Sequence, residues 1–598
     1  MPRFIGVDGE AWDKDDDHMY VLLAASTGEY AFDPKGLSTI RCFEFLLELP
    51  RKAVKCGFGL NYDVNMMLRD VPLEQLIRLW KEGNCKWKTY YIEWIPGKSF
   101  FIKSCGRACK IYDVFGFFQS SFVKALEKWN IEVPEDVEAM KEARSEFDAS
   151  MKKRIIEYCI KECEATVDIM DQLEHALNEV DLSISNWIGA GAIASALMKR
   201  HHVQEHHVYD SEWPEVESGI LCAYFGGRVE LFRQGEFRRV WDYDISSAYP
   251  SIAIELPSLK GASWRWCSHY DPSLQWCIWD CQWDLPDSFL CPFPVRHKGA
   301  IYYPRNGRGW YHSAEVKAAQ NLTGNRINVN GGWHLQTTGD DKPFSFIPDT
   351  YVHRAQLKRE QHAGEKVLKL GLNSIYGKLA QGAGYQGKPP LFQSFFWAGA
   401  ITAGTRARVL EIAARDVNNL VMIATDGIFF KSDPDIDLVD GLGGLELSIM
   451  DDMFVAQAGV YQAIVDGESY ARSRGFFTTE IDFNDLRKGF ADQGCTYVGS
   501  YLPKKGRFVG LGSSLISKRL HMWRSWHRSE RQISLHPSRK FVEDYDSRSV
   551  VDLIPPTFKD PEPSEIYVPK PGFAILSDSD LEGLLEYIQG TEQPMRSE

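Results

Sequence analysis

The stretch Trp241-Asp-Tyr-Asp-Ile-Ser-Ser-Ala-Tyr-Pro-Ser-Ile252 decides the fold of this 598-residue chain. Its first residues predict a strand that ends on Asp244, and the small residues after it predict a turn that brings the chain back to Tyr249. A strand that ends in an acid is common by itself. Its meaning here depends on two later stretches.

The first of these, Lys369-Leu-Gly-Leu-Asn-Ser-Ile-Tyr-Gly-Lys378, predicts a helix with Lys369, Asn373 and Tyr376 at i, i+4 and i+7 on one face. The second, Val421-Met-Ile-Ala-Thr-Asp-Gly-Ile-Phe-Phe430, predicts a strand hairpin that carries Asp426. An acid, a Lys/Asn/Tyr helix and a second acid, in that order, resemble motifs A, B and C of family B DNA polymerases.

This resemblance implies a template-directed DNA polymerase that adds deoxynucleotides to a primer 3′ end. Such a site uses two divalent cations, Mg²⁺ or Mn²⁺, which bridge the primer hydroxyl and the triphosphate and are held by carboxylates from separate strands. Asp244 and Asp426 would be these ligands. Lys369 would offer its charge to the triphosphate and to the leaving pyrophosphate.

Five other residues would bind the incoming dNTP. Tyr249 would lie under its sugar and exclude a 2′-hydroxyl, which favours a DNA product, and Asn373 and Tyr376 would pack against the nascent base pair. Arg354 and Lys358, four apart on the preceding helix, would grip the same phosphates.

The chain departs from the family pattern at three positions. Ala424 stands where the family has an aspartate, Gly427 replaces the usual serine, and Gly459 replaces the lysine of the KxY motif, in which Tyr461 is retained. Because the missing carboxylate is generally the accessory one, we expect activity with an altered rate or metal preference. These departures leave an alternative open, a nucleic-acid-binding replication factor or nuclease with a degenerate polymerase site.

The N-terminal region carries a second group of acids. Phe4-Ile-Gly-Val-Asp-Gly-Glu10 predicts a strand with Asp8 and Glu10 on one face, and carboxylates so close together usually need a cation. Asp63 follows in Cys56-Gly-Phe-Gly-Leu-Asn-Tyr-Asp63, and Tyr158 and Glu162 lie four apart on a predicted helix. Together these resemble the three Exo motifs of DEDDy-type 3′–5′ proofreading exonucleases.

The exonuclease resemblance implies hydrolysis of a phosphodiester with two metals. Asp8, Glu10, Asp63 and Glu162 would hold them, and Tyr158 would orient the attacking water. The family has an aspartate where Glu162 stands, so the longer side chain shifts the metal shell.

A basic stretch indicates contact with the DNA backbone. Residues 501–540 hold ten Lys and Arg against one acid, and Tyr224-Phe-Gly-Gly227 resembles the YxGG motif that joins exonuclease and polymerase domains. We expect DNA contacts from Tyr224, Gly226, Gly227, Tyr461, Arg474, Lys504, Lys505 and Arg507.

The fold implied is an α/β and α+β multidomain protein with an RNase H-like exonuclease domain and a right-hand polymerase of palm, fingers and thumb. We expect the exonuclease over 1–195, a connector over 196–230, the palm over 231–300 and 381–480, a TPR1-like insertion over 301–348, the fingers over 349–380, the thumb over 481–540 and a mobile acidic tail over 541–598. In this tail Ser577–Gln589 predicts a short helix that either docks a replication partner or packs back on the body.

Composition indicates the cellular compartment in which the protein acts. No apolar run reaches transmembrane length, and 13 scattered cysteines argue for free thiols, so we expect a cytoplasmic protein (a host cytoplasm if it is viral) without membrane contact. The net charge of −14 is a weak argument against DNA binding, because phosphate contact needs only a local basic surface.

The spacing between motifs bears on priming. The 125 residues from Asp244 to Lys369 resemble the protein-primed phage branch, whereas the 50 from Tyr376 to Asp426 leave little room for that branch's second insertion. We therefore expect poor unaided strand displacement. Priming by a protein, an RNA, a DNA end or nothing stays open. Expected partners are primer-template DNA and dNTPs, with a terminal protein, a single-strand-binding protein or a helicase as further candidates.

Overall fold

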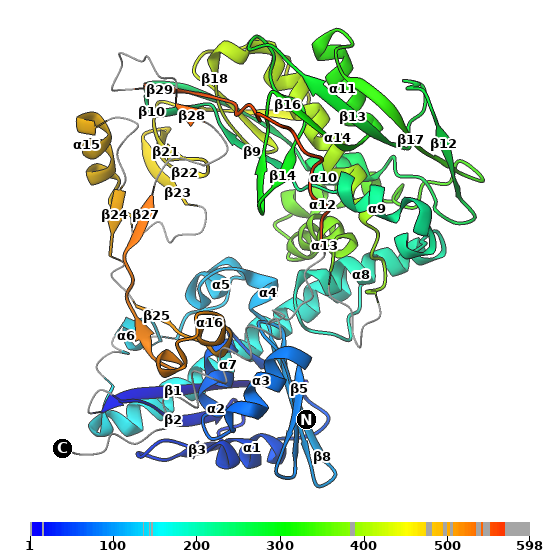
Figure 1. Ribbon diagram of the computed structural model, residues 1–598. Helices are drawn as coiled ribbons and strands as arrows, with labels where there is room; N and C mark the ends of the chain where they lie inside the picture. The colour runs from blue at the N-terminus through cyan, green and yellow to red at the C-terminus, as the bar shows by residue number, and fades with distance from the viewer. Residues whose placement is uncertain are drawn as a thin grey trace, which may run out of the picture.

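The structure, a computed structural model, describes most of the chain. The described residues are 3–14, 17–134, 137–142, 144, 147–382, 389–473, 481–493, 499–502, 506–533, 540–541 and 550–568. They form a mixed α/β protein with two bodies, one N-terminal and one C-terminal, seen at the bottom and top of Figure 1. In this part of the chain no helix is both long enough and apolar enough to cross a membrane.

The N-terminal body (residues 3–182) is built on an eight-stranded sheet, in the order β3-β2-β1-β4-β8-β7-β6-β5. β1 is parallel to β4, and β4 is parallel to β8, while the other neighbours are antiparallel. The strands are β1 (Phe4–Lys14), β2 (Asp17–Ala25), β3 (Tyr30–Phe32), β4 (Val54–Gly57), β5 (Asn84–Trp87), β6 (Tyr90–Ile95), β7 (Ser99–Ser104) and β8 (Arg107–Asp113).

Helices cover this sheet. They are α1 (Thr39–Glu48), α2 (Asn61–Met67), α3 (Leu73–Glu82), α5 (Phe122–Lys128), α6 (Val137–Glu142) and the 28-residue α7 (Lys152–Glu179). A Cβ at Gly6 of β1 would lie 2.0 Å from the carbonyl oxygen of Cys163 in α7, so only glycine permits this close packing. The contact brings the middle of α7 directly against β1.

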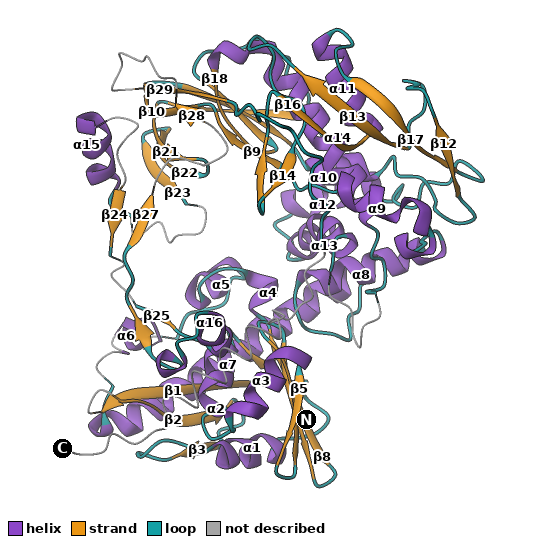
Figure 2. Cartoon of the chain, in the orientation of Figure 1, coloured by secondary structure: helices purple, strands orange, loops and turns teal. Residues whose placement is uncertain are grey.

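The C-terminal body (residues 214–472, 540–541 and 550–568) holds three larger sheets and the two-stranded sheet of β14 (Val295–His297) and β15 (Ala300–Tyr302), with strands shown in orange in Figure 2. The five-stranded sheet has the order β20-β11-β19-β18-β9, and the six-stranded one β23-β22-β21-β10-β29-β28. Their strands are β9 (Arg228–Leu231), β10 (Arg233–Phe237), β11 (Val240–Ile245), β18 (Leu420–Thr425), β19 (Gly427–Phe430), β20 (Leu445–Met450), β21 (Asp452–Gln457), β22 (Val460–Val465), β23 (Glu468–Arg472), β28 (Lys540–Phe541) and β29 (Val550–Ile554).

The third sheet, β12-β17-β13-β16, comprises β12 (Ser263–Cys267), β13 (Cys277–Asp284), β16 (Asn306–His312) and β17 (Asn328–Gln336). The domain boundary that we expected at residue 300 therefore falls inside this sheet. Local sequence does not reveal the boundary, because β12 pairs with β17 across the intervening residues 268–327, and β13 pairs with β16 across residues 285–305.

Helices of the C-terminal body include α9 (Pro214–Ala223), α10 (Ala248–Ala253), α11 (Ser313–Thr323), α12 (Ile347–Arg359), α13 (Gly364–Leu379) and α14 (Phe395–Ala413). α13 confirms the predicted helix that carries Lys369, Asn373 and Tyr376, and α12 confirms the preceding helix with Arg354 and Lys358. α8 (Ala190–Arg200), which follows the N-terminal body, packs against α13.

An arm (residues 499–502 and 506–533) joins the two bodies a second time, at the left of Figure 1. It follows α15 (Phe483–Gln493), and β24 (Gly499–Tyr501) pairs with β27 (Arg531–Ile533) at its base. At its tip, β25 (Arg507–Phe508), β26 (Trp526–His527) and α16 (Leu511–Ile516) lie on the N-terminal body.

One asparagine anchors this tip. The side-chain oxygen of Asn65 accepts hydrogen bonds from the backbone N–H of Leu511 at 2.7 Å and from the indole of Trp523 at 2.9 Å. Leu511 and Leu515 join the core of the N-terminal body beside Trp80. The Leu511 N–H is buried and Trp523 is half-buried, so losing their acceptor is costly.

The prediction of a mobile tail over 541–598 is wrong for residues 550–568. β29 pairs with β10, the N–H of Arg305 donates to the carbonyl of Pro556, and the ring of Tyr567 lies 4.7 Å from that of Tyr224. An acidic, proline-rich composition did not reveal these distant partners. The helix expected at 577–589 lies outside the described residues.

We expect Asn65→Ala to loosen the arm from the N-terminal body. Loss of the shared acceptor leaves the buried Leu511 N–H and the half-buried Trp523 indole unpaired, at a cost of about 1–3 kcal/mol, so amide hydrogen exchange over residues 511–523 should accelerate about tenfold or more. Asn84→Ala, in which an amide donating to the Glu82 carbonyl is lost elsewhere on this body, is the matched control. Equal exchange rates in the two variants would contradict the anchoring role.

Candidate active sites

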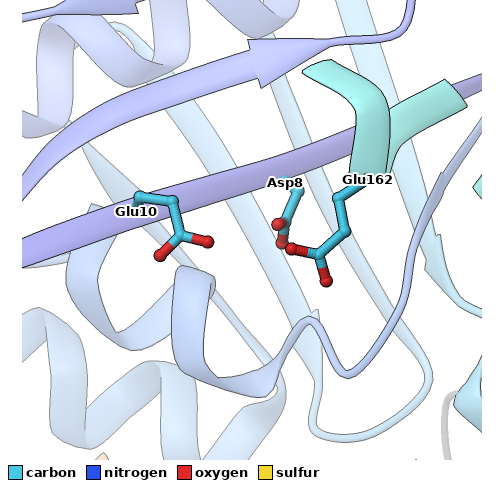
Figure 3. Close-up of side chains that lie close together, drawn as sticks. All are labelled: Asp8, Glu10 and Glu162. Carbon is cyan, nitrogen blue, oxygen red and sulfur yellow. The ribbon is translucent and has the colours of Figure 1, made fainter. Parts of the chain in front are cut away.

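Three carboxylates meet in the N-terminal body, as Figure 3 shows. Asp8 and Glu10 project from the same face of β1, and Glu162 reaches them from α7. Oxygen atoms of the three groups all lie within 4.8 Å of one another, and no other set of three possible ligands this close occurs among the residues described. The structure thus brings together three of the four predicted exonuclease ligands.

The fourth predicted ligand, Asp63, is buried at the start of α2 and accepts a hydrogen bond of 2.9 Å from the hydroxyl of Tyr20. Burial raises the pKa of Asp63 to about 7. The pKa of Asp8 is also raised, by burial first and then by the charges of Glu162, Asp63 and Glu10. All four acids therefore share one electrostatic environment.

Two cations that sequence reasoning missed stand among these acids. A guanidinium nitrogen of Arg144 lies 2.7 Å from Glu10 and 3.1 Å from Glu162, and Lys141 forms an ion pair with Glu162. Burial alone would raise the pKa of Glu162, but Arg144 and Lys141 lower it below its usual value. Lys141 in α6 and Arg144 are three residues apart, and this spacing was the one feature of the sequence that could have indicated them.

Tyr158 lies one helical turn before Glu162 in α7 and is buried. Burial, followed by the charges of Glu10 and Glu162, raises the pKa of its phenol well above the usual value, so the hydroxyl stays protonated. Arg144 lies 5.8 Å from the centre of its ring.

The donor set in the N-terminal body fits a divalent cation. Carboxylate oxygens are the ligands that Mg²⁺ and Mn²⁺ prefer. The Oδ2 atom of Asp8 is buried without a hydrogen-bond partner in the described part of the chain, which is costly unless a cation or a proton occupies the position.

A second acidic site lies on the five-stranded sheet. Asp244 is exposed on β11, Asp426 occupies the tight turn between β18 and β19, and the N–H of Ile245 donates to the Asp426 carbonyl at 3.1 Å. Asp244 also stands directly opposite Gly427 of β19. Two predicted ligands that are distant in sequence are thus neighbours.

Asp242, which sequence reasoning did not single out, joins this site. Burial first, and then the charges of Asp244 and Asp426, raise its pKa to about 8. Burial and then Asp244 raise the pKa of Asp426 to about 6. The alternation that places Asp8 and Glu10 on one strand face also applies to Asp242 and Asp244, so the signal was in the sequence.

A tyrosine cluster borders this second site. The hydroxyls of Tyr224 and Tyr376 lie 2.8 Å apart, and the rings of Tyr249 and Tyr376 are 4.8 Å apart. A Cβ at Gly227 would lie 2.7 Å from the Tyr249 hydroxyl, so glycine is needed there. The predicted nucleotide-binding tyrosines and the YxGG-like segment are therefore in direct contact.

A buried ion pair holds the YxGG-like segment. The guanidinium of Arg406 in α14 contacts Glu315 of α11 at 2.7 Å and donates to the carbonyls of Phe225 and Gly226. A Cβ added at Gly226 would have no other atom within 4 Å, so the space next to this residue is open. Sequence reasoning missed this pair, because nothing local links residues 91 positions apart.

The remaining predicted nucleotide ligands lie on α12 and α13. Lys369 and Asn373 are exposed on α13, and Lys358 is exposed on α12. Arg354 forms an ion pair with Glu365 at 2.9 Å, which ties α12 to α13. This partner was not foreseen, and it competes with a phosphate for the guanidinium.

The predicted DNA-binding residues are scattered. Tyr461 lies in β22, with its ring 6.0 Å from Phe429 beside the second site. Arg507 is exposed at the tip of the arm, close to the N-terminal body. Arg474, Lys504 and Lys505 lie outside the described residues.

Comparison with known proteins gives consistent results. The family described as "DNA polymerase type B, organellar and viral" matches residues 118–384. The chain is 25% identical over 312 residues to a DNA polymerase of Acidianus bottle-shaped virus (isolate Italy/Pozzuoli), across 50% of this chain and 45% of the relative. It is 28% identical over 166 residues to a "Probable DNA polymerase" of Podospora anserina, across 27% and 13% of the two chains. The chain thus spans less than half the length of these curated relatives.

Solved structures of Phi29 DNA polymerase share the fold. With primer-template DNA bound, that polymerase matches with a TM-score of 0.61 at 15% identity, covering 89% of this chain and all of that one. With incoming nucleotide substrates also present, the TM-score is 0.60 at 15% identity, over 90% and 100% of the two chains.

We expect Glu315→Ala to destabilise the protein strongly. It leaves the buried guanidinium of Arg406 without its carboxylate, which typically costs about 3–5 kcal/mol. Replacing both partners, as Glu315→Leu with Arg406→Met, should cost less, although the Phe225 and Gly226 carbonyls then lose a donor. Denaturant unfolding measures both variants. Glu82→Ala breaks an exposed pair with Arg78 and is the control, with little change expected.

Proposed function

We propose that the chain is a template-directed DNA polymerase with a 3′–5′ exonuclease, in keeping with its similarity to the type B DNA polymerases of organelles and viruses. The observation that carries the proposal is that Asp244 on β11 meets Asp426 in the turn before the adjacent strand β19, beside the cluster of Tyr224, Tyr249 and Tyr376. The family supplies the substrate class, and this arrangement supplies the site.

In the polymerase site, Asp244 and Asp426 would hold two divalent cations. Bound Mg²⁺ or Mn²⁺ lowers the pKa of an attacking hydroxyl and neutralises charge on a transferring phosphate. Tyr249 packs between Gly227 and Tyr376, and its ring would exclude a ribose 2′-hydroxyl by collision, so deoxynucleotides are the expected substrates.

The exposed face of α13 would bind the triphosphate. Lys369 and Asn373 project from it next to Tyr376, and a lysine there can offset the charge that builds up on the leaving pyrophosphate. Arg354 would take part only after leaving Glu365, so we assign it a secondary role.

The N-terminal body would be the exonuclease, with an RNase H-like fold. Asp8, Glu10, Asp63 and Glu162 would hold cations that activate water and stabilise the leaving oxygen. Tyr158 keeps its proton and can orient the water by hydrogen bonding. Arg144 and Lys141 offset the negative charge of the acids through ion pairs with Glu10 and Glu162. Some of these ion pairs must break or lengthen when cations bind the same carboxylates.

Domain roles follow from these sites. The five- and six-stranded sheets would form the palm, and α12 and α13 the fingers. The β12-β17-β13-β16 sheet would be the TPR1-like insertion, and α15 with the arm the thumb. Primer-template DNA and dNTPs are the proposed ligands, in line with the DNA and nucleotides bound to Phi29 DNA polymerase. A terminal protein, a single-strand-binding protein and a helicase are proposed further partners.

Primer extension tests the polymerase. The wild type should extend a labelled primer on a DNA template with Mg²⁺ or Mn²⁺, and Asp244→Asn should lower the rate by about 10³-fold or more, as expected when charge stabilisation is lost in phosphoryl transfer. Asp433→Asn is the matched control, because Asp433 accepts a hydrogen bond from Tyr243 on the opposite face of β11. No extension by the wild type would refute the proposal and favour the nuclease or binding-factor alternative.

The exonuclease has its own test. Asp8→Ala combined with Glu10→Ala should abolish removal of mismatched 3′ nucleotides while primer extension continues, because the two sites lie in separate bodies. Gel analysis of a 3′-labelled mismatched primer measures trimming. Loss of both activities would mean that the bodies do not act independently.

A further inference from the structure

Two acids share one face of β11. Asp242 and Asp244 are two residues apart, and they stand opposite Phe429 and Gly427 of β19. The Oδ1 atom of Asp242 is buried and has no hydrogen-bond partner among the residues that the structure describes. Such an oxygen is costly to leave bare, so the position favours a cation or a donor that arrives from outside.

The glycine at 427 makes room for this carboxylate. A Cβ added there would lie 3.2 Å from Oδ1 of Asp242 and 3.6 Å from Oδ1 of Asp244. Both oxygens therefore flank the same empty point on β19. A serine, as the family has at this position, would crowd Asp242.

Ala424 is the position at which this chain lacks a carboxylate that the family has. It stands on β18 directly opposite Gly427, on the sheet face that also carries Asp242 and Asp244. The family places an aspartate at this position. The chain thus keeps three carboxylates around the turn at Asp426 but moves one of them from β18 to β11.

Nothing nearby neutralises Asp242. In the described ranges it takes part in none of the ion pairs with Lys or Arg, and its cross-strand partners are Phe429 on β19 and Ser448 on β20. Phe429 stands opposite it, with the ring of Tyr461 6.0 Å from that of Phe429. An acid held among apolar and phenolic groups binds a cation more strongly than one in water does.

We propose that Asp242 is a third cation ligand of the polymerase site, taking the place of the aspartate lost at Ala424, with Gly427 providing the space. The inference rests on the proposed polymerase function and deepens it. It explains how the site keeps its negative charge despite Ala424.

Mn²⁺ binding tests the assignment without relying on activity. In a background carrying Asp8→Ala and Glu10→Ala, which removes the exonuclease cations, electron paramagnetic resonance titration follows Mn²⁺ at the remaining site. Asp242→Asn should weaken Mn²⁺ binding by about tenfold or more. Asp433→Asn, the same charge change on the opposite face of β11, should leave binding as it is.

A compensating variant guards against simple misfolding. Adding Ala424→Asp to Asp242→Asn returns the third carboxylate to β18 and should recover at least part of the Mn²⁺ affinity. In primer extension, Asp242→Asn should raise the Mg²⁺ concentration for half-maximal rate by a similar factor, and the added Ala424→Asp should lower it again.

The outcomes separate the two proposals. Equal Mn²⁺ affinity in Asp242→Asn and Asp433→Asn, with normal extension by the wild type, overturns the role of Asp242 and leaves the polymerase intact. Recovery by Ala424→Asp supports the exchange of ligands, and its absence from a folded double variant contradicts it. A wild type that does not extend primers refutes the polymerase itself.

Discussion

Negative charges are held close together against their mutual repulsion at two places in this protein. In the N-terminal body the repulsion among Asp8, Glu10 and Glu162 is offset by Arg144 and Lys141. In the C-terminal body the acids carry raised pKa values and one bare buried oxygen instead. Clusters of this kind cost stability unless cations bind, so much of the scaffold serves to keep them in place.

The scaffold does this by close contact between distant segments. Gly6 lets α7 press against β1, which puts Glu162 over Asp8. In the other body, Arg406 and Glu315 fix the carbonyls of Phe225 and Gly226, and the Tyr224 hydroxyl reaches Tyr376. In each case one glycine or one buried ion pair sets the position of the neighbouring site.

The two bodies are linked twice, through α7 and α8 and through the arm. The arm's tip is anchored at Asn65, two residues after Asp63 in α2. The C-terminal residues return in the same way, and Tyr567 packs beside Tyr224. Segments that follow the polymerase motifs in sequence therefore support both sites.

The sequence by itself determined which acids would gather and on which elements. Alternation on a strand predicted the shared face of Asp8 and Glu10, and helical spacing predicted that of Lys369, Asn373 and Tyr376. Only the tertiary structure decided their partners, namely Arg144 beside Glu10, Glu365 beside Arg354, and Asn65 under the arm. Periodicity acts between neighbours within one element, whereas these contacts join residues of different elements, 11 positions apart for Arg354 and Glu365 and 134 for Arg144 and Glu10. They form only when those elements pack together. Asp242 belongs to both groups, because its strand face follows from alternation while its bare oxygen beside Gly427 appears only when β11 and β19 pair.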